Sequence, residues 1–239
     1  MVTIPKYPNC LIYDLISKRE INIYWTKYVE LLFDTIPALQ GKIFRFSHVP
    51  GNYRKRELHP ALELLIKAGL IHKIIHSAGQ GIPLSAQAKP EIFKLIFLDV
   101  ALAQTILGLD TASWLLNPET SFVNKGTLTE AFVGQEMLAY TAHDQKTQLY
   151  FWQRQQRGSN AEIDYLLQKN QQIIPIEVKS GAPGRLKSLN IFLDEHKNSP
   201  FGVRVSAMNY SIDERLHSFP LYAIAQLMDF SKKDVEALL

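Results

Sequence analysis

The clearest alternation of apolar and polar positions lies in the N-terminal half of the chain. Over residues 54–68, leucine, alanine and isoleucine recur at three- and four-residue steps, which predicts a helix with one apolar face. Gly69 is placed to cap the C-terminus of this helix. A short strand is expected at 70–75, a glycine-rich turn at 77–81 and a returning strand at 82–84. Helix, strand, turn and strand in this order are typical of a winged helix-turn-helix.

The most apolar run of the chain covers residues 92–109. Lys94 and Asp99 lie inside it, and burying either charge in lipid would be costly. The run is therefore expected to form a core helix and not a membrane span.

A change of character follows the turn-like residues 117–119 and predicts a domain boundary. We expect an N-terminal segment at 1–19, a winged-helix-like domain at 20–115 and a second domain at 116–239. The second domain is expected to contain a helix, three strands, a helix and a strand, at 124–140, 148–153, 161–168, 172–179, 189–196 and 202–206. This order predicts an α/β (α+β) fold with a mixed sheet flanked by helices, in which the three strands form an antiparallel meander.

Charged residues interrupt the second of these three strands. Side chains alternate between the two faces of a strand, so residues two apart are neighbours on one face. Ile163 and Tyr165 are expected to share one face, and Glu162 and Asp164 the other. Glu162 could then serve as an outer ligand beside Asp164.

The third strand repeats this arrangement, because Glu177 and Lys179 alternate with apolar residues. If the tight turn at 169–170 pairs the two strands, Asp164, Glu177 and Lys179 lie on one surface. Mg²⁺ is usually bound by one or two carboxylates together with water and phosphate oxygens. Mn²⁺ is an alternative.

We therefore predict a divalent metal site with Asp164 and Glu177 as ligands. Lys179 would orient or help to deprotonate an attacking water, or stabilise charge that develops on a phosphate. Glu130 of the preceding helix is expected to be a further ligand. The small residue Gly134, one turn later, would let this helix approach the sheet.

Each of these residues also has a plain structural interpretation. Glu177 and Lys179 could be a surface ion pair, which would stabilise the fold by only about a few tenths of a kcal/mol. Glu130 could be a solvated helix residue, and Asp164 could pair with Arg154. These alternatives stay open from the residues alone.

The composition narrows the function only slightly. The formal charge is +3 and the hydrophobic content is 46%, which suits a well-cored protein and is compatible with a DNA partner. The single cysteine, Cys10, excludes an intramolecular disulfide and a cysteine-based zinc cluster. The N-terminal residues lack the apolar core of a signal peptide, so a cytoplasmic location without membrane association is expected.

Two basic groups are candidates for contacts with DNA phosphates. Arg54, Lys55 and Arg56 precede the amphipathic helix, and Arg185 and Lys187 lie in a basic loop near the proposed site. For the first group, a solvated helix start is the alternative.

Several segments of the sequence resemble a known family. They are residues 125–133 (KGTLTEAFV), 149–152 (LYFW), 162–165 (EIDY), 174–181 (IPIEVKSG), 53–58 (YRKREL), 61–71 (ALELLIKAGLI), 93–100 (FKLIFLDV) and 219–222 (FPLY). The chain resembles the C-terminal region of bacterial and archaeal P-loop ATPases of the AAA type, a domain of unknown function with a nuclease-like fold. The resemblance covers roughly residues 20–225.

The resemblance implies a winged-helix module followed by a restriction-endonuclease-like core of the PD-(D/E)xK kind. It places Glu130, Asp164, Glu177 and Lys179 at the positions of the nuclease motif. The expected function is metal-dependent DNA phosphodiester cleavage. The alternative is a catalytically inactive module for DNA binding or protein interaction, since similar cores serve as inactive binding platforms.

The chain departs from this family at the nucleotide site. Residues 181–188 come closest to a phosphate-binding loop, but Leu186 stands where the second loop glycine is needed. We therefore expect no ATP binding by this chain, which looks like a truncated or split member. A separate ATPase subunit is an expected partner.

Overall fold

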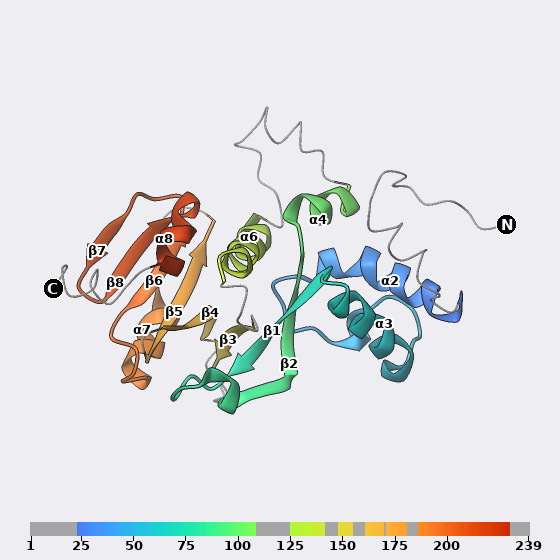
Figure 1. Cartoon of the computed structure of the whole chain (residues 1–239), viewed down its shortest axis with the longest axis horizontal. Helices are drawn as coiled ribbons and strands as arrows, with labels where there is room; N and C mark the ends of the chain where they lie inside the picture. The colour runs from blue at the N-terminus through green and yellow to red at the C-terminus, as the bar shows by residue number, and fades with distance from the viewer. Residues whose placement is uncertain are drawn as a thin grey trace.

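The computed structural model of the chain describes residues 23–108, 125–141, 148–154, 161–169, 171–180 and 186–229. Within these residues one mixed sheet has the strand order β2-β1-β3-β4-β5-β6-β8-β7 (Figure 1). The strands are β1 (Ile71–Ser77), β2 (Ala88–Phe97), β3 (Leu149–Gln153), β4 (Glu162–Lys169), β5 (Gln172–Lys179), β6 (Gly202–Ser206), β7 (Ser211–Asp213) and β8 (Leu216–Pro220).

Helices flank this sheet on both sides. They are α2 (Ile23–Leu39), α3 (Lys55–Lys67), α4 (Val100–Ile106), α6 (Lys125–Ala139), α7 (Lys187–Glu195) and α8 (Ile224–Asp229), with short 3₁₀ helices at Phe46–His48, Leu84–Gln87 and Leu221–Ala223. The expected α/β (α+β) class, with a mixed sheet and flanking helices, is confirmed. None of the helices in the described ranges has the length and apolar character needed to cross a membrane.

Helix α3 forms where the amphipathic pattern predicted it. The buried residues of its apolar face are Leu58, Ala61, Leu62 and Leu65. They pack against α2 and against one face of the β1–β2 pair. Gly69 follows the helix with φ +72°, and its N–H donates to the carbonyl of Ile66. A residue in this left-handed conformation ends many helices, and glycine adopts it without steric cost.

The prediction of a core helix over residues 92–109 was wrong. Residues 88–97 form β2, which pairs with β1 in the antiparallel direction, and only 100–106 are helical. Asp99 caps this short helix, because its Oδ1 accepts a hydrogen bond of 2.8 Å from the N–H of Leu102. A strand covered on both faces is apolar without alternation, so the pattern alone could not separate it from a buried helix.

The β1–β2 hairpin is part of the main sheet. The returning strand expected at 82–84 begins at Ala88 instead, after the 3₁₀ helix Leu84–Gln87. β1 also pairs in parallel with β3, with Ile74 opposite Leu149. The sheet therefore runs from the N-terminal half into the C-terminal half, and the domain boundary near 116 stays a prediction.

The C-terminal half contains the expected meander, since β3, β4 and β5 pair antiparallel in sequence order. β5 continues in parallel to β6, and β6 to β8. Ile174 packs in the cluster that includes residues of α6 and α8, whereas its neighbour Ile173 packs in the cluster that includes α7. α6 and α8 therefore cover one face of the sheet and α7 the other (Figure 1).

Candidate functional site

A β-bulge lies in β4 at the predicted metal ligand. Tyr150 of β3 is opposite Leu166, and Trp152 is opposite Ile163, so two steps along β3 match three steps along β4. Ile163 packs in the α7 cluster and Tyr165 in the α6 cluster, so the expectation that they share a face was wrong. An extra residue in one strand breaks the alternation and redirects side chains locally. Asp164 lies inside this bulge.

The side chain of Asp164 crosses to β5. Its Oδ2 accepts a hydrogen bond of 2.7 Å from the N–H of Val178. Tyr165 is opposite Ile176 in the β4–β5 ladder, so one residue further along, Asp164 lies beside Glu177. Burial raises the pKa of Asp164, although a nearby lysine and the Val178 hydrogen bond act in the opposite direction.

Glu177 is only 7% exposed. Its Oε1 lies 2.5 Å from Nζ of Lys179, whereas its Oε2 is buried and has no hydrogen-bond partner in the described structure. Burial, followed by the nearby charge of Asp164, raises the pKa of Glu177 to about 7. A solvated surface pair does not describe this buried carboxylate.

Glu130 approaches the same group from α6. Its side chain is 13% exposed, so it is not a solvated helix residue. A Cβ added to Gly134 would lie 2.5 Å from the hydroxyl oxygen of Tyr165 and 2.8 Å from Ile96. The close approach of the helix to the sheet, which the small residue predicted, is confirmed.

Lys94 was not predicted to belong to this group. Its Nζ lies 2.9 Å from Oε1 of Glu130 and 2.5 Å from Oε1 of Glu162. Burial lowers the pKa of Lys94, but Glu130, Glu162 and Asp164 outweigh this effect and raise it above its ordinary value. Lys94 is therefore a buried ammonium ion, and its one sequence signal is a charge within the apolar run 92–97.

The strand geometry explains why Lys94 faces α6. Phe93, Leu95 and Phe97 alternate along β2 toward the core formed by α2 and α3. Ile96 belongs instead to the cluster beneath α6, and Lys94 is two residues before it on the same face of the strand.

Within the described residues, acidic groups outnumber basic groups at this site by two. The carboxyls belong to Glu130, Glu162, Asp164 and Glu177, and the ammonium groups to Lys94 and Lys179. Burial raises the pKa of Glu130 to about 7, as it does that of Glu177. When all four carboxyls are ionised, one divalent cation with a charge of +2 would balance their excess over the two ammonium groups.

The chemistry of these donors fits such a cation at Asp164 and Glu177. In the part of the chain that the structure describes, no group of three His, Cys, Asp or Glu side chains is arranged to hold a metal ion. Lys94 binds Glu130 and Glu162, which leaves the other two carboxylates. Mg²⁺ commonly uses two carboxylates and completes its shell with water and phosphate oxygens. The unpartnered Oε2 of Glu177 suits this role.

The other charged residues predicted to take part are paired elsewhere, lie on the surface or fall outside the described residues. Nη2 of Arg154 lies 2.5 Å from Oε1 of Glu195. Arg54, Lys55 and Arg56 are exposed at the start of α3, and Lys187 is exposed at the start of α7; Arg185 lies outside the described residues. α3 packs beside β1, whereas α7 packs over β4 and β5 (Figure 1), and contact of either helix with DNA stays a prediction.

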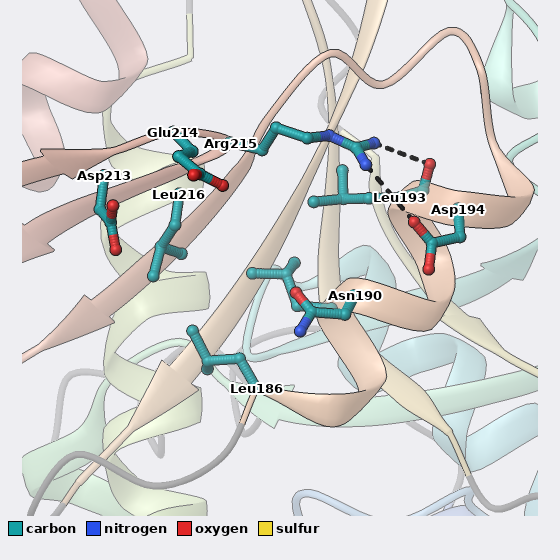
Figure 2. Close-up of a pocket in the computed structure, with 9 residues that line it drawn as sticks. Leu186, Asn190, Leu193, Asp194, Asp213, Glu214, Arg215 and Leu216 are labelled. Atoms are coloured by element: carbon teal, nitrogen blue, oxygen red, sulfur yellow. Dashed lines mark hydrogen bonds and ion pairs between the residues drawn. The ribbon is translucent and has the colours of Figure 1, made fainter.

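A pocket of about 540 Å³ lies between α7 and the β7–β8 hairpin. Figure 2 shows Arg215 extended across one side of it, with its guanidinium bound to the carbonyl of Leu193 at 2.9 Å and to Asp194 at 3.4 Å. This pocket shares no residue with the carboxylate group, and its arginine is already paired. We therefore place the candidate site at the carboxylates.

Comparison with curated proteins and with solved structures gave no significant match. Two family comparisons did match. Residues 18–113, which include Lys94, match the family described as Domain of unknown function (DUF8612). Residues 125–224, which include the four predicted motif residues, match the family described as Domain of unknown function (DUF4143). The expected domain of unknown function in the C-terminal half is thus confirmed.

Proposed function

We propose that the chain is a metal-dependent DNA phosphodiesterase with a PD-(D/E)xK-type site in residues 125–224. The observation that carries this proposal is the buried, unpartnered Oε2 of Glu177 beside Asp164, in a group with two more acidic than basic side chains. An excess of buried carboxyls of this kind is suited to binding a divalent cation.

The roles follow from the positions of the side chains. Asp164 and Glu177 would hold Mg²⁺ or Mn²⁺, which when bound supplies a more acidic water and neutralises charge on a phosphate. Lys179 is 32% exposed and contacts Glu177, which supports a role for its ammonium in orienting a water at the solvent side. Glu162, whose charge also acts on Glu177, is 30% exposed.

The reaction would be a hydrolysis. The oxygen of a water forms a bond to phosphorus while the bond to the leaving sugar oxygen breaks. The proton released by the water passes through solvent to that oxygen, and Lys179 stabilises the negative charge that develops on the phosphate oxygens.

The N-terminal half and a partner enter the proposal less directly. A winged-helix role for α3 and the β1–β2 hairpin is supported by their order, and Arg54, Lys55 and Arg56 offer phosphate contacts. The resemblance to the C-terminal region of AAA-type ATPases supports a separate ATPase subunit as the partner.

The test is cleavage of plasmid, single-stranded and branched DNA with Mn²⁺. Wild type and the matched control Asp194→Asn, at a side chain that is 72% exposed, should cleave at equal rates. Asp164→Asn should lose activity by ~100-fold or more. No cleavage of any substrate, or equal rates for all three proteins, would overturn the proposal.

One observation favours a second function. The ammonium of Lys94 forms ion pairs with Glu130 and Glu162, so two of the four carboxylates already have a cation without a metal ion. The second function is that of a non-catalytic DNA-binding or protein-interaction module. This function predicts salt-sensitive DNA binding in EDTA that Asp164→Asn leaves unchanged. Binding that requires a divalent cation and Asp164 would exclude it.

A further inference from the structure

We infer that Lys94 occupies a cation position of the carboxylate group, and that removing its charge opens this position to a second divalent cation. The inference deepens the proposed function, since it rests on the carboxylates of that site and limits the wild-type site to one ion. The residue that sets this limit comes from β2, in the segment matched by a different family from the one that holds the carboxylates.

Lys94 is bound as a metal ion would be bound, by oxygen atoms from separate elements. Glu130 approaches from α6 and Glu162 from β4, at 2.9 and 2.5 Å from the ammonium nitrogen. The same nitrogen lies 5.2 Å from the ring centroid of Phe151, and its side chain is 1% exposed. The ammonium of Lys94 is therefore held inside the protein and does not reach solvent.

Lys73 gives a direct comparison on the neighbouring strand. Its Nζ lies 2.6 Å from Oε1 of Glu63, and its side chain is 22% exposed. Lys73 is thus an ordinary ion pair with one carboxylate, whereas Lys94 lies between Glu130 and Glu162 and in the field of Asp164.

A second observation distinguishes Asp164 and Glu177 from the two carboxylates that Lys94 binds. Glu177 is 93% buried, and its Oε2 has no partner in the described structure although Lys179 occupies Oε1. The site therefore divides into two pairs of carboxylates. One pair, Glu130 and Glu162, is bound by Lys94, and the other, Asp164 and Glu177, remains for one divalent ion.

A divalent ion could take the place of Lys94 with small movements. Metal–oxygen distances are about 2.1 Å for Mg²⁺, so each carboxylate oxygen would move by less than about 1 Å from its present distance to the ammonium. Without Lys94, the carboxylates of Glu130 and Glu162 would lose their cation, and a divalent ion could compensate their charge in its place.

The experiment counts bound Mn²⁺ by equilibrium dialysis and by loss of the free-ion spin-resonance signal. We expect one Mn²⁺ in wild type and two in Lys94→Met. Lys73→Met, the matched control, should keep one. The double variant Lys94→Met/Glu162→Gln should bind the second ion at least ~10-fold more weakly than Lys94→Met. An unchanged number and affinity in Lys94→Met would overturn the inference.

The outcomes separate the inference from the proposed function. If wild type binds no ion and Lys94→Met binds one, the cation position of Lys94 is supported, but the metal site of the proposed function fails and the bound ion is not a second one. If wild type and Lys94→Met both bind one ion with the same affinity, the proposed site stands and the inference fails. If neither protein binds Mn²⁺, both are wrong.

A loss of folding is also informative. Lys94→Gln keeps an N–H donor for Glu130 and is the second variant. If either variant is unfolded in EDTA, Mn²⁺ added during refolding should restore its near-ultraviolet circular dichroism, because the cation stabilises only the folded site. Failure of both variants to fold with Mn²⁺ would contradict an open cation position.

Discussion

Tyr165 donates its phenolic hydrogen to the backbone carbonyl of Glu130, with an oxygen–oxygen distance of 2.8 Å. This bond joins β4 to α6 one residue away from Asp164, and Tyr165 is fully buried. Burial raises the pKa of Tyr165 well above its ordinary value, so its hydroxyl remains a donor. The helix that carries Glu130 is thereby fixed to the strand that carries Asp164.

Tyr165→Phe should reduce the free energy of unfolding by about 1 kcal/mol, because one buried hydrogen bond is lost and no atom is added. Urea denaturation measures this change. Tyr222→Phe is the control, since Tyr222 is 84% exposed, and its midpoint should not move. Equal midpoints for the two variants would show that the Tyr165 bond contributes nothing.

Gly134→Ala should destabilise the fold by about 1–3 kcal/mol, because a Cβ there lies 2.5 Å from the hydroxyl oxygen of the buried Tyr165. Gly126 lies in the same helix, and its nearest contact would be 3.7 Å away. Gly126→Ala should therefore be neutral or stabilise by up to about 1 kcal/mol, as alanine favours helix. Thermal unfolding of both variants checks the contrast, which would disappear if α6 can shift outward freely.

His76 should make stability depend on pH. Burial, with a smaller contribution from the charge of Lys89, lowers the pKa of His76, whereas the hydrogen bond between its Nε2 and the carbonyl of Gln153 and the charge of Glu91 act in the opposite direction. The unfolded chain then binds more protons below about pH 6.5, so the free energy of unfolding falls as pH drops toward the folded-state pKa. Urea denaturation at pH 7.5 and 5.5 measures the loss.

His76→Gln should make this loss smaller, whereas His48→Gln, at an exposed position, should leave it as in wild type. A pH dependence that His76→Gln does not change would assign the effect to other groups.

Replacing Arg54, Lys55 and Arg56 together by glutamine should weaken DNA binding and lower its dependence on salt. Each phosphate contact contributes about 0.9 to the slope of log affinity against log salt concentration, so three contacts predict a decrease of about 2.7. Fluorescence anisotropy over a range of NaCl concentrations measures the slope.

The control for this experiment changes the net charge equally at exposed lysines elsewhere. Lys42, Lys67 and Lys197 are exposed, and their joint replacement by glutamine should leave most of the slope. If both triple variants lose the same amount, binding reflects overall charge and not a surface at the start of α3.

Regular alternation and turns made the C-terminal elements predictable. The expected strands at 148–153, 161–168 and 172–179 lie within one residue of β3, β4 and β5 at every end. Asp164, Glu177 and Lys179 stood out in the sequence because they are charges inside otherwise apolar strands, and Glu130 because a small residue follows it by one turn. Their roles at a metal site stay predictions.

The remainder depended on tertiary contacts that leave no period in the sequence. The strand β2 was expected to be helical, since both of its faces are covered and its apolar run lacks alternation. Lys94 was missed for the same reason, because a strand is needed to direct it toward Glu130. The bulge at Asp164 is visible only in the pairing of β3 with β4.

The parallel pairing of β1 with β3 has a consequence for dissecting the protein. Residues 125–224 produced alone would present the edge of β3 with its backbone N–H and C=O groups unpaired, which is a template for intermolecular strand addition. Fragments cut at the family limits should therefore self-associate, and biochemical work on either half would report on aggregates unless the two halves are co-expressed.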